Sequence, residues 1–311
     1  MAKPSEAVLR RAAEWYAELR SNSDPAMATA FAQWRDADAA HGEAWRRVQA
    51  ISRQFEPLRD ADREVTLETL DQMRAARHGR RRVLAGIALA GGGLLGLGVW
   101  RRDELAESVL AATAGDRSAV GEITRLAAAD GAIWLNTGSA LDRDGGRFEL
   151  RQGEVYVDTP SPLEIATRHG IVSLARGRCS VRRHPASSEI HLFSGNATVR
   201  SAHGVQDLEA GQGCQLSAAG VSRPQRADAA REAWIRGVVL AENLRLDALV
   251  AELARYQRGH IGVAGEIAHL RVLGGFPATD PQRALEMLEK ALPVRVRRVL
   301  PWWTTVEARP L

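Results

Sequence analysis

Cysteine is scarce in this chain, and the residues that usually bind metals lack the spacing that a metal site needs. The 311 residues include two cysteines, Cys179 and Cys214. There is no Cys-x-x-Cys pair, and no set of cysteines and histidines has the spacing of metal ligands. The eight histidines contain no His-Glu-x-x-His motif, and no Gly-x-Ser-x-Gly motif marks a nucleophile. We therefore expect no catalytic residue, no metal and no cofactor, and we predict that the protein is not an enzyme.

A large excess of charge of either sign is also missing. The 42 basic and 38 acidic residues leave a net charge of +4, which is too small to predict direct binding of nucleic acid. Hydrophobic residues make up 45% of the chain and charged residues 26%. This composition is typical of a globular protein, and the length leaves room for two or three domains.

One long uncharged segment stands out in the middle of the chain. Residues 83–100 contain no charge and would extend roughly 27 Å as a helix, which is just enough for a hydrocarbon core of about 30 Å. Arg80, Arg81 and Arg82 directly precede this segment, and Trp100 ends it. Basic residues on one flank and an aromatic residue at the boundary predict a single transmembrane helix with a cytoplasmic N-terminus.

Two alternatives for this segment stay open. Its six glycines are compatible with a buried, glycine-rich segment of a soluble domain. The sequence Arg81-Arg82-Val83-Leu84 also resembles part of a twin-arginine export signal, so the route of insertion is undecided. We do not expect a cleaved secretory signal, because 82 residues precede the uncharged segment.

Residues 1–78 carry apolar side chains at helical spacing and predict a small all-α bundle. Ser5 can cap a first helix, and Asp24 followed by Pro25 is a typical start for a second. The further boundaries that we expect are His41-Gly42 before a third helix, Pro57 at its end and Asp62 at the start of a fourth.

Each of the first three predicted helices carries one tryptophan. Trp15, Trp34 and Trp45 are expected mainly to fill a core that few other side chains could fill. A bundle this small is marginally stable by itself and can settle fully on a partner helix. The three tryptophans are therefore our candidates for both core and partner-contact residues of a protein-binding domain.

From about residue 111 to 225, short apolar runs alternate with glycine-containing turns, which predicts an all-β sandwich or stack. Cys179 and Cys214 lie in two of these runs. A disulfide between them is possible outside the cytoplasm, and two free buried thiols are the alternative; the adjacency of their strands decides. The expected strands are 119–123, 132–136, 147–150, 153–157, 163–166, 170–173, 179–181, 189–193, 197–199 and 214–216.

Residues 234–309 predict a compact α+β domain built from two helix–strand units. The first helix carries apolar residues from Leu246 to Tyr256 and is ended by Gly259. The remaining expected elements are strands at 260–263 and 271–276, a helix that begins at Asp280-Pro281, and paired strands at 294–297 and 303–306.

Motifs in three of these segments resemble one known family. They are Phe31-x-x-Trp34 with His41 and Ala44-Trp45-x-x-Val48, then Asp130-Gly131 with Trp134-Leu135-Asn136-Thr137-Gly138-Ser139-Ala140-Leu141, Arg147 with Gly153-Glu154-Val155-Tyr156-Val157, and Asn243 to Gly259 with Arg255-Tyr256, Gly274-x-Phe276 and Asp280. Their order around one span resembles the FecR family of transmembrane sigma-factor regulators of Gram-negative bacteria, over about residues 5–309. The C-terminal segment is similar to the short N-terminal domain of secretins and TonB-dependent transporters.

This resemblance implies a transmembrane anti-sigma factor of a cell-surface signalling system. Its cytoplasmic helices would bind an extracytoplasmic-function sigma factor, and its periplasmic part would sense the signalling domain of a TonB-dependent outer-membrane receptor, for iron or siderophore uptake. Site-1 and intramembrane proteases would then release the cytoplasmic fragment from the inner membrane. The implied domains are a sigma-binding domain (1–78), a transmembrane helix (83–100), a FecR-like β domain (111–225) and a C-terminal receptor-signalling-domain-like domain (234–309).

One departure from the family pattern matters. Family members commonly carry Gly-Thr-x-Phe-x-Val, and some self-cleave at the Gly-Thr bond, whereas this chain has Gly177-Arg178-Cys179-Ser180-Val181. Arg178 has no hydroxyl to attack the preceding carbonyl, so we expect the chain to stay intact there. The alternative function is a cell-envelope or secretion-assembly adaptor that binds no sigma factor, which would have no need for the tryptophan-rich helical domain.

Overall fold

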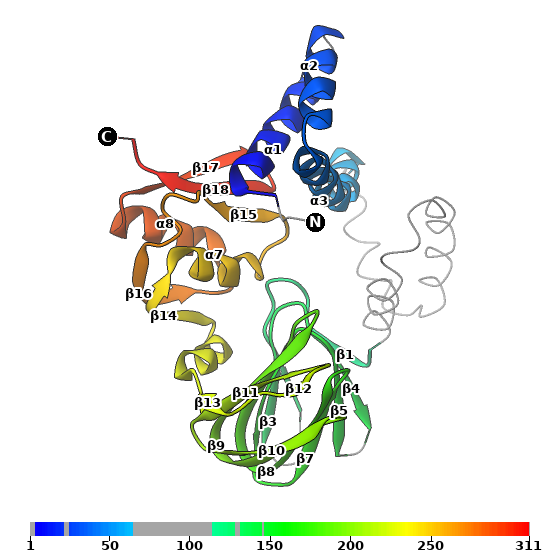
Figure 1. Ribbon diagram of the computed structural model, residues 1–311, viewed down its shortest axis with the longest axis vertical. Coiled ribbons are helices and arrows are strands. Elements are labelled where there is room, and N and C mark those ends of the chain that lie inside the picture. The colour runs from blue at the N-terminus through cyan, green and yellow to red at the C-terminus, as the bar shows by residue number, and fades with distance from the viewer. Residues whose placement is uncertain (1–3, 22–24, 65–113, 128–130, 145, 311) are drawn as a thin grey trace, which may run out of the picture.

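The computed structural model describes residues 4–21, 25–64, 114–127, 131–144 and 146–310. Figure 1 shows three parts: helices at the N-terminus, a large β domain, and a C-terminal α+β part. The predicted span at 83–100 and the arginines that precede it, Arg80, Arg81 and Arg82, lie outside the described residues. Among the residues that are described, no helix is both long and apolar enough to cross a membrane.

The N-terminal part consists of α1 (Glu6–Ser21), α2 (Pro25–Asp36) and α3 (Ala39–Glu64). The Ser5 hydroxyl accepts a hydrogen bond from the Val8 amide at 3.4 Å, which confirms the predicted cap of α1. Pro25 is the first residue of α2, as its fixed φ angle favours.

Two predicted helix boundaries were wrong. The break before α3 lies at Asp38 rather than at His41-Gly42, because the Asp38 carboxylate caps α3 by accepting from the Ala40 amide at 2.8 Å. The helix α3 then continues through Pro57 to Glu64, so Asp62 does not begin a separate helix. A proline inside a helix removes one backbone hydrogen bond and favours a kink, but it does not always end the helix.

The β domain is one continuous sheet that curls into a nearly closed barrel (Figure 1), rather than two stacked sheets. Along the main path the strand order is β1-β4-β5-β7-β8-β6-β3-β2, while β9 pairs with β8 and carries β10 and β11 on its far edge. The strands are β1 (Asp116–Arg117), β2 (Thr124–Leu126), β3 (Ala132–Leu135), β4 (Ala140–Asp144), β5 (Arg147–Gln152), β6 (Glu154–Thr159), β7 (Leu163–Thr167), β8 (Gly170–Arg183), β9 (Ser187–Ser201), β10 (Gly204–Glu209), β11 (Gln212–Ser217), β12 (Gly220–Val221) and β13 (Gln225–Arg226).

Two pairs of predicted strands are each one long strand. The runs 170–173 and 179–181 both belong to β8, and 189–193 and 197–199 both belong to β9. The two strands stay paired through register shifts on either side of Gly177. A side chain there would meet the Ser194 carbonyl oxygen at 2.0 Å, and φ is +120°, so the bulge requires glycine.

The strand predicted at 119–123 was wrong. This segment turns instead, because the Ala119 carbonyl accepts from the amides of both Glu122 and Gly138. Gly121 has φ of +86°, which interrupts an extended strand. Six further strands of the barrel were not predicted: β1, β2, β4, β10, β12 and β13.

The C-terminal part has two small sheets and two helices, which confirms the predicted α+β character. A 3-10 helix, η2 (Ala229–Arg236), leads into it, and Asp280 caps α8 by accepting from the Arg283 amide at 3.0 Å. One sheet pairs β14 with β16, and the other has the order β15-β18-β17. The elements are β14 (Val238–Arg245), α7 (Leu246–Ala254), β15 (His260–Val263), β16 (Arg271–Pro277), α8 (Pro281–Ala291), β17 (Val294–Leu300) and β18 (Trp303–Ala308).

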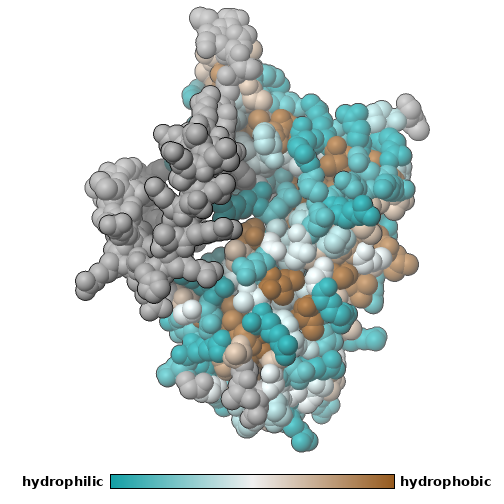
Figure 2. Space-filling model, turned by 180° about the vertical axis from the view of Figure 1, so that it is seen from behind, coloured by the Kyte–Doolittle hydropathy of each residue, from teal (hydrophilic) through white to brown (hydrophobic). Residues whose placement is uncertain are grey.

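The three parts make direct contacts. Helix α1 packs against the sheet β15-β18-β17, so the first helix and the last strands of the chain lie side by side (Figure 1), and the C-terminal part also contacts one end of the barrel. Figure 2 shows the opposite side, where several hydrophobic residues break the hydrophilic surface at mid-height. The most exposed large hydrophobic side chain of the described residues is Leu273 of β16, at 82%.

Candidate functional site

The predicted partner-contact residues come together in the N-terminal helices. Trp15 of α1 contacts the Trp34 ring of α2, with ring centroids 6.4 Å apart, and Phe31 joins Trp45 of α3 at 4.4 Å. His41 stacks on Trp34 at 4.5 Å, and its Nδ1 bonds the Trp34 carbonyl. The aromatic residues of the quoted helical motif thus form one continuous cluster that fixes the three helices to one another.

The three tryptophans differ in exposure. Trp15 is 8% exposed, and its buried indole nitrogen has no hydrogen-bond partner among the described residues. Trp34 and Trp45 are half-buried at the surface of the bundle. The core role predicted for all three therefore fits Trp15 best, while Trp34 and Trp45 also present edges to which a partner could bind.

A second cluster, which we call the junction, joins the barrel to the C-terminal part. The Glu154 carboxylate at the start of β6 is 2% exposed and lies 2.8 Å from the guanidinium of Arg255, which caps the C-terminus of α7. The Asn136 amide nitrogen donates to the same carboxylate at 2.9 Å. The Ser180 hydroxyl also donates to it at 3.4 Å. Because a buried carboxylate is costly without partners, the bond to Arg255 helps to fix the C-terminal part on the barrel.

Glu252 of α7 extends the junction and binds three arginines. Its carboxylate lies 2.6 Å from Arg182 of β8, 2.8 Å from Arg231 of η2 and 3.0 Å from Arg255. Burial acts to raise the pKa of Glu252, but the three positive charges outweigh this effect and lower the pKa to about 2. Glu252 is therefore ionised at neutral pH and connects β8, η2 and α7.

Neutral hydrogen bonds complete the same contact. The Tyr256 hydroxyl donates to the Asn136 side-chain oxygen at 2.7 Å, and the Thr137 hydroxyl donates to the Arg255 carbonyl at 3.0 Å. Gly121 approaches so closely that a side chain there would meet the Tyr256 carbonyl oxygen at 2.9 Å. The junction is thus a tight, hydrogen-bonded contact between two folded parts.

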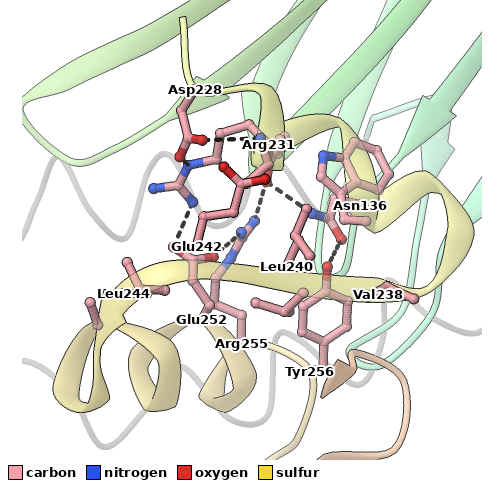
Figure 3. Close-up of a pocket in the computed structure, with 15 residues that line it drawn as sticks. Asn136, Asp228, Arg231, Val238, Leu240, Glu242, Leu244, Glu252, Arg255 and Tyr256 are labelled. Atoms are coloured by element: carbon pink, nitrogen blue, oxygen red, sulfur yellow. Dashed lines mark hydrogen bonds and ion pairs between the residues drawn. The ribbon is translucent and has the colours of Figure 1, made fainter. Parts of the chain in front are cut away.

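The junction borders a cavity of about 100 Å³. Figure 3 shows Asn136 and Tyr256 pointing toward each other on one side of this cavity, and Arg231 and Arg255 meeting Glu252 on the other. The space suffices for a few water molecules. No group of three or more metal-ligating side chains occurs among the described residues.

The junction was not predicted from the sequence, although several of its residues lie in the family motifs. Glu154, Asn136 and Thr137 belong to the quoted β-domain motifs, and Arg255 and Tyr256 belong to the quoted C-terminal motif. The structure shows that these separate motifs meet in space. The opposite charges of Glu154 and Arg255 are compatible with a pair, but no sequence pattern connects residues so far apart.

The two cysteines lie in strands on either side of β9. Cys179 of β8 is opposite Leu192, and Cys214 of β11 is opposite Ile190. Strand β9 lies between them, so the two cysteines are not on adjacent strands. Both are free buried thiols in the structure, an arrangement that favours the unbonded alternative; the disulfide itself stays a prediction.

Arg178, where the family pattern has threonine, is engaged in other contacts. Its guanidinium lies 2.7 Å from the Glu232 carboxylate of η2, and its amide donates to the Ser194 hydroxyl at 3.1 Å. The Tyr156 hydroxyl also donates to Glu232. Here Arg178 helps to bind η2 to the barrel, and the integrity of the Gly177–Arg178 bond stays a prediction.

Comparisons with known proteins bear on two parts of the chain. A family model described as a domain of unknown function (DUF4880) matches residues 10–51, which lie within α1, α2 and α3. No curated protein sequence matches the chain. Two crystal structures of a candidate anti-sigma factor from Parabacteroides distasonis ATCC 8503, at 2.50 and 1.65 Å resolution, resemble it with TM-scores of 0.50 and 0.51.

Sequence identity to both structures is 15%, and the alignments cover 62% and 61% of this chain and 97% of each matched chain. At this identity the likeness shows a shared fold.

Proposed function

We propose that this protein is a transmembrane anti-sigma factor whose N-terminal helices bind an extracytoplasmic-function sigma factor. The observation that carries this proposal is the combination of two folded parts on one chain. One is a small helical bundle with half-buried tryptophans, and 61–62% of the chain aligns with the fold of a candidate anti-sigma factor. Binding another protein needs no catalytic residue, cofactor or metal, and we propose no enzymatic activity.

The segment 83–100 is proposed to cross the inner membrane once, with the helices in the cytoplasm and the barrel and C-terminal part in the periplasm. The uncharged length and the preceding arginines support this topology. The contact of α1 with the C-terminal sheet needs both ends of the chain on one side of a membrane. In the inserted protein these surfaces would therefore be separate and free for other partners.

The periplasmic part is proposed to sense the signalling domain of a TonB-dependent outer-membrane receptor, in a system for iron or siderophore uptake. The junction supports the idea that the barrel and the C-terminal part respond as one unit, because buried ion pairs and hydrogen bonds connect them. Receptor engagement would then favour a state that site-1 and intramembrane proteases cleave.

Capture of a sigma factor from the host membrane fraction tests this proposal. The full chain, solubilised in detergent, should retain an extracytoplasmic-function sigma factor, and Trp34→Ala should weaken that retention at least tenfold. Leu273→Ala is the matched control, since Leu273 is exposed on the distant sheet β14-β16 and its loss should leave retention unchanged. If none of the host's sigma factors is retained, the proposal fails.

The membrane topology has its own test. Protease added to spheroplasts should digest the barrel and C-terminal part and leave a protected fragment that contains the helices. Protection of the whole chain, or digestion of both ends, would contradict the proposed orientation. An envelope or secretion-assembly adaptor is the second candidate, and it predicts the same topology without capture of a sigma factor.

A further inference from the structure

One face of the C-terminal sheet carries a helix in this structure. The sheet face, as we call it, is formed by β15, β18 and β17 with Trp302 and Trp303, and α1 covers it with Leu9 and Ala13. Trp302 also meets Tyr16 edge-on, with ring centroids 5.7 Å apart. Beneath α1, Trp303 is 0% and Trp302 8% exposed.

Polar and charged pairs surround this apolar contact. Glu6 of α1 lies 3.1 Å from the His260 ring nitrogen, and Arg10, one helical turn later, lies 3.4 Å from Glu307. The helix thus places a carboxylate against the imidazole and a positive charge against the Glu307 carboxylate, which fixes the direction in which a helix can lie.

Glu14 follows one further turn along α1 and pairs with Arg297 at 3.4 Å. At the opposite end of the contact, Gly262 makes room for Glu6, since a side chain there would lie 1.9 Å from the Glu6 carboxylate. The sheet face therefore accepts an amphipathic helix with carboxylates spaced two turns apart.

Two polar groups beneath α1 have no partner among the described residues. They are the Trp303 indole nitrogen and the Thr305 hydroxyl, and both residues are 0% exposed. Thr305 is paired in the sheet with Gly262 on one side and Arg297 on the other, the two positions that meet the carboxylates of α1. Because buried polar groups normally make hydrogen bonds, α1 matches the charges of this face but not its polar centre.

We infer that the sheet face is a docking site for an amphipathic helix of a periplasmic partner, and that α1 occupies it here in place of that helix. The inference rests on the span in the proposed function, which would remove α1 from the periplasm. Without a helix the two tryptophans would form an exposed aromatic patch, which is typical of a binding site. The partner helix carries two carboxylates that match His260 and Arg297, and a polar side chain between them that bonds Thr305 or Trp303.

The test uses the full chain in detergent and a labelled peptide of residues 5–21 as the probe. The chain carries Glu6→Arg, Arg10→Glu and Glu14→Arg, which should release its own α1 from the sheet face. The peptide should bind this chain, measured by fluorescence anisotropy, and a peptide with the same three reversals should bind at least tenfold more weakly. Circular dichroism establishes that the variant chain is folded.

A charge swap tests the geometry. For this arm the chain keeps Glu14 and carries Glu6→Arg, Arg10→Glu and Arg297→Glu, so that none of these pairs with its own α1 is favourable. A peptide with Glu14→Arg should bind this chain more tightly than the unmodified peptide does. Thr305→Val should strengthen binding of the unmodified peptide at least threefold, because α1 leaves this hydroxyl unpaired. Equal binding of all peptides, or no binding to a folded chain, would overturn the docking site.

The final arm separates this inference from the proposed function. In spheroplasts, the unmodified peptide should bind the wild-type chain directly, since the span would keep α1 away from the sheet face. Binding to the undocked chain in detergent without binding in spheroplasts would overturn the role of a periplasmic partner. None of these measurements involves a sigma factor, so failure to capture one leaves their outcomes unaffected.

Discussion

Glu154 and Arg255 form a 2.8 Å ion pair that joins the barrel to the C-terminal part across 101 residues of sequence. Glu154 is 2% exposed and the Arg255 side chain 19%. The pair is the centre of the junction, and its energetics differ from those of the surface ion pairs elsewhere in the chain.

We expect Arg255→Ala to be strongly destabilising. Removal of the guanidinium leaves the Glu154 carboxylate buried without a positive charge, with only the Asn136 amide and the Ser180 hydroxyl as side-chain donors, which costs about 3–5 kcal/mol. Urea unfolding of the full chain in detergent measures this loss. The matched control is Arg283→Ala in the exposed pair with Glu286, which should change stability by less than about 0.5 kcal/mol. Equal effects of the two substitutions would contradict the role of the junction.

Stability should fall as the pH drops from about 4.5 to about 2. The pKa of Glu252 is lowered in the folded state from its ordinary value near 4.5 to about 2, so the unfolded chain takes up the proton first. The contribution is complete above pH 4.5, amounts to about 3 kcal/mol and is lost through this window.

Glu252→Gln tests this assignment, because a neutral side chain cannot titrate. The variant should be less stable at pH 7 and should lose less stability on acidification than the wild type does. Some loss will persist, because His184 and His191 also hold the pKa of Glu189 below its usual range. An unchanged pH profile in the variant would exclude Glu252 as a source of the acid sensitivity.

The two thiols should be unreactive in the folded protein. Burial raises the pKa of Cys179 to about 12 and that of Cys214 to about 11, so neither is a thiolate at neutral pH. A thiol reagent should detect no thiol in the native chain and two after denaturation without reductant. No reactive thiol after denaturation would show that the disulfide forms instead.

The purified chain should remain in one piece near Gly177. Arg178 has no hydroxyl nucleophile, and its side chain is held by Glu232. A denaturing gel should show a single band after prolonged storage. The variant Arg178→Thr restores the family residue and provides the comparison. Two stable fragments from the wild-type chain would refute this prediction.

The sequence predicted those elements whose cause is local. Ser5 and Asp280 mark helix starts through their own side chains, and the apolar pattern of residues 246–256 is sufficient to predict α7. The helix end predicted at Pro57 was wrong, because the cost of one proline is smaller than the gain from continuing α3.

The features that the sequence could not predict depend on distant contacts. The pairing of Glu154 with Arg255 requires the barrel and α7 to be placed first. The burial of the Thr305 hydroxyl without a hydrogen-bond partner among the described residues likewise depends on α1 covering the sheet. The closure of the barrel likewise depends on which strands pair. The same strand pairing places β9 between the strands that carry Cys179 and Cys214. The periodicity of apolar residues predicts which face of a helix or strand is buried, but not which other elements pack against it.

The central claim, that this chain regulates a sigma factor, is tested most directly by transcription in vitro. Core RNA polymerase, the host's extracytoplasmic-function sigma factor and its promoter are combined with the full chain in detergent. The account predicts that equimolar chain changes sigma-dependent transcription at least tenfold and that Trp34→Ala abolishes most of this effect. Transcription that stays unchanged with every such sigma factor, at a large excess of folded chain, would contradict it.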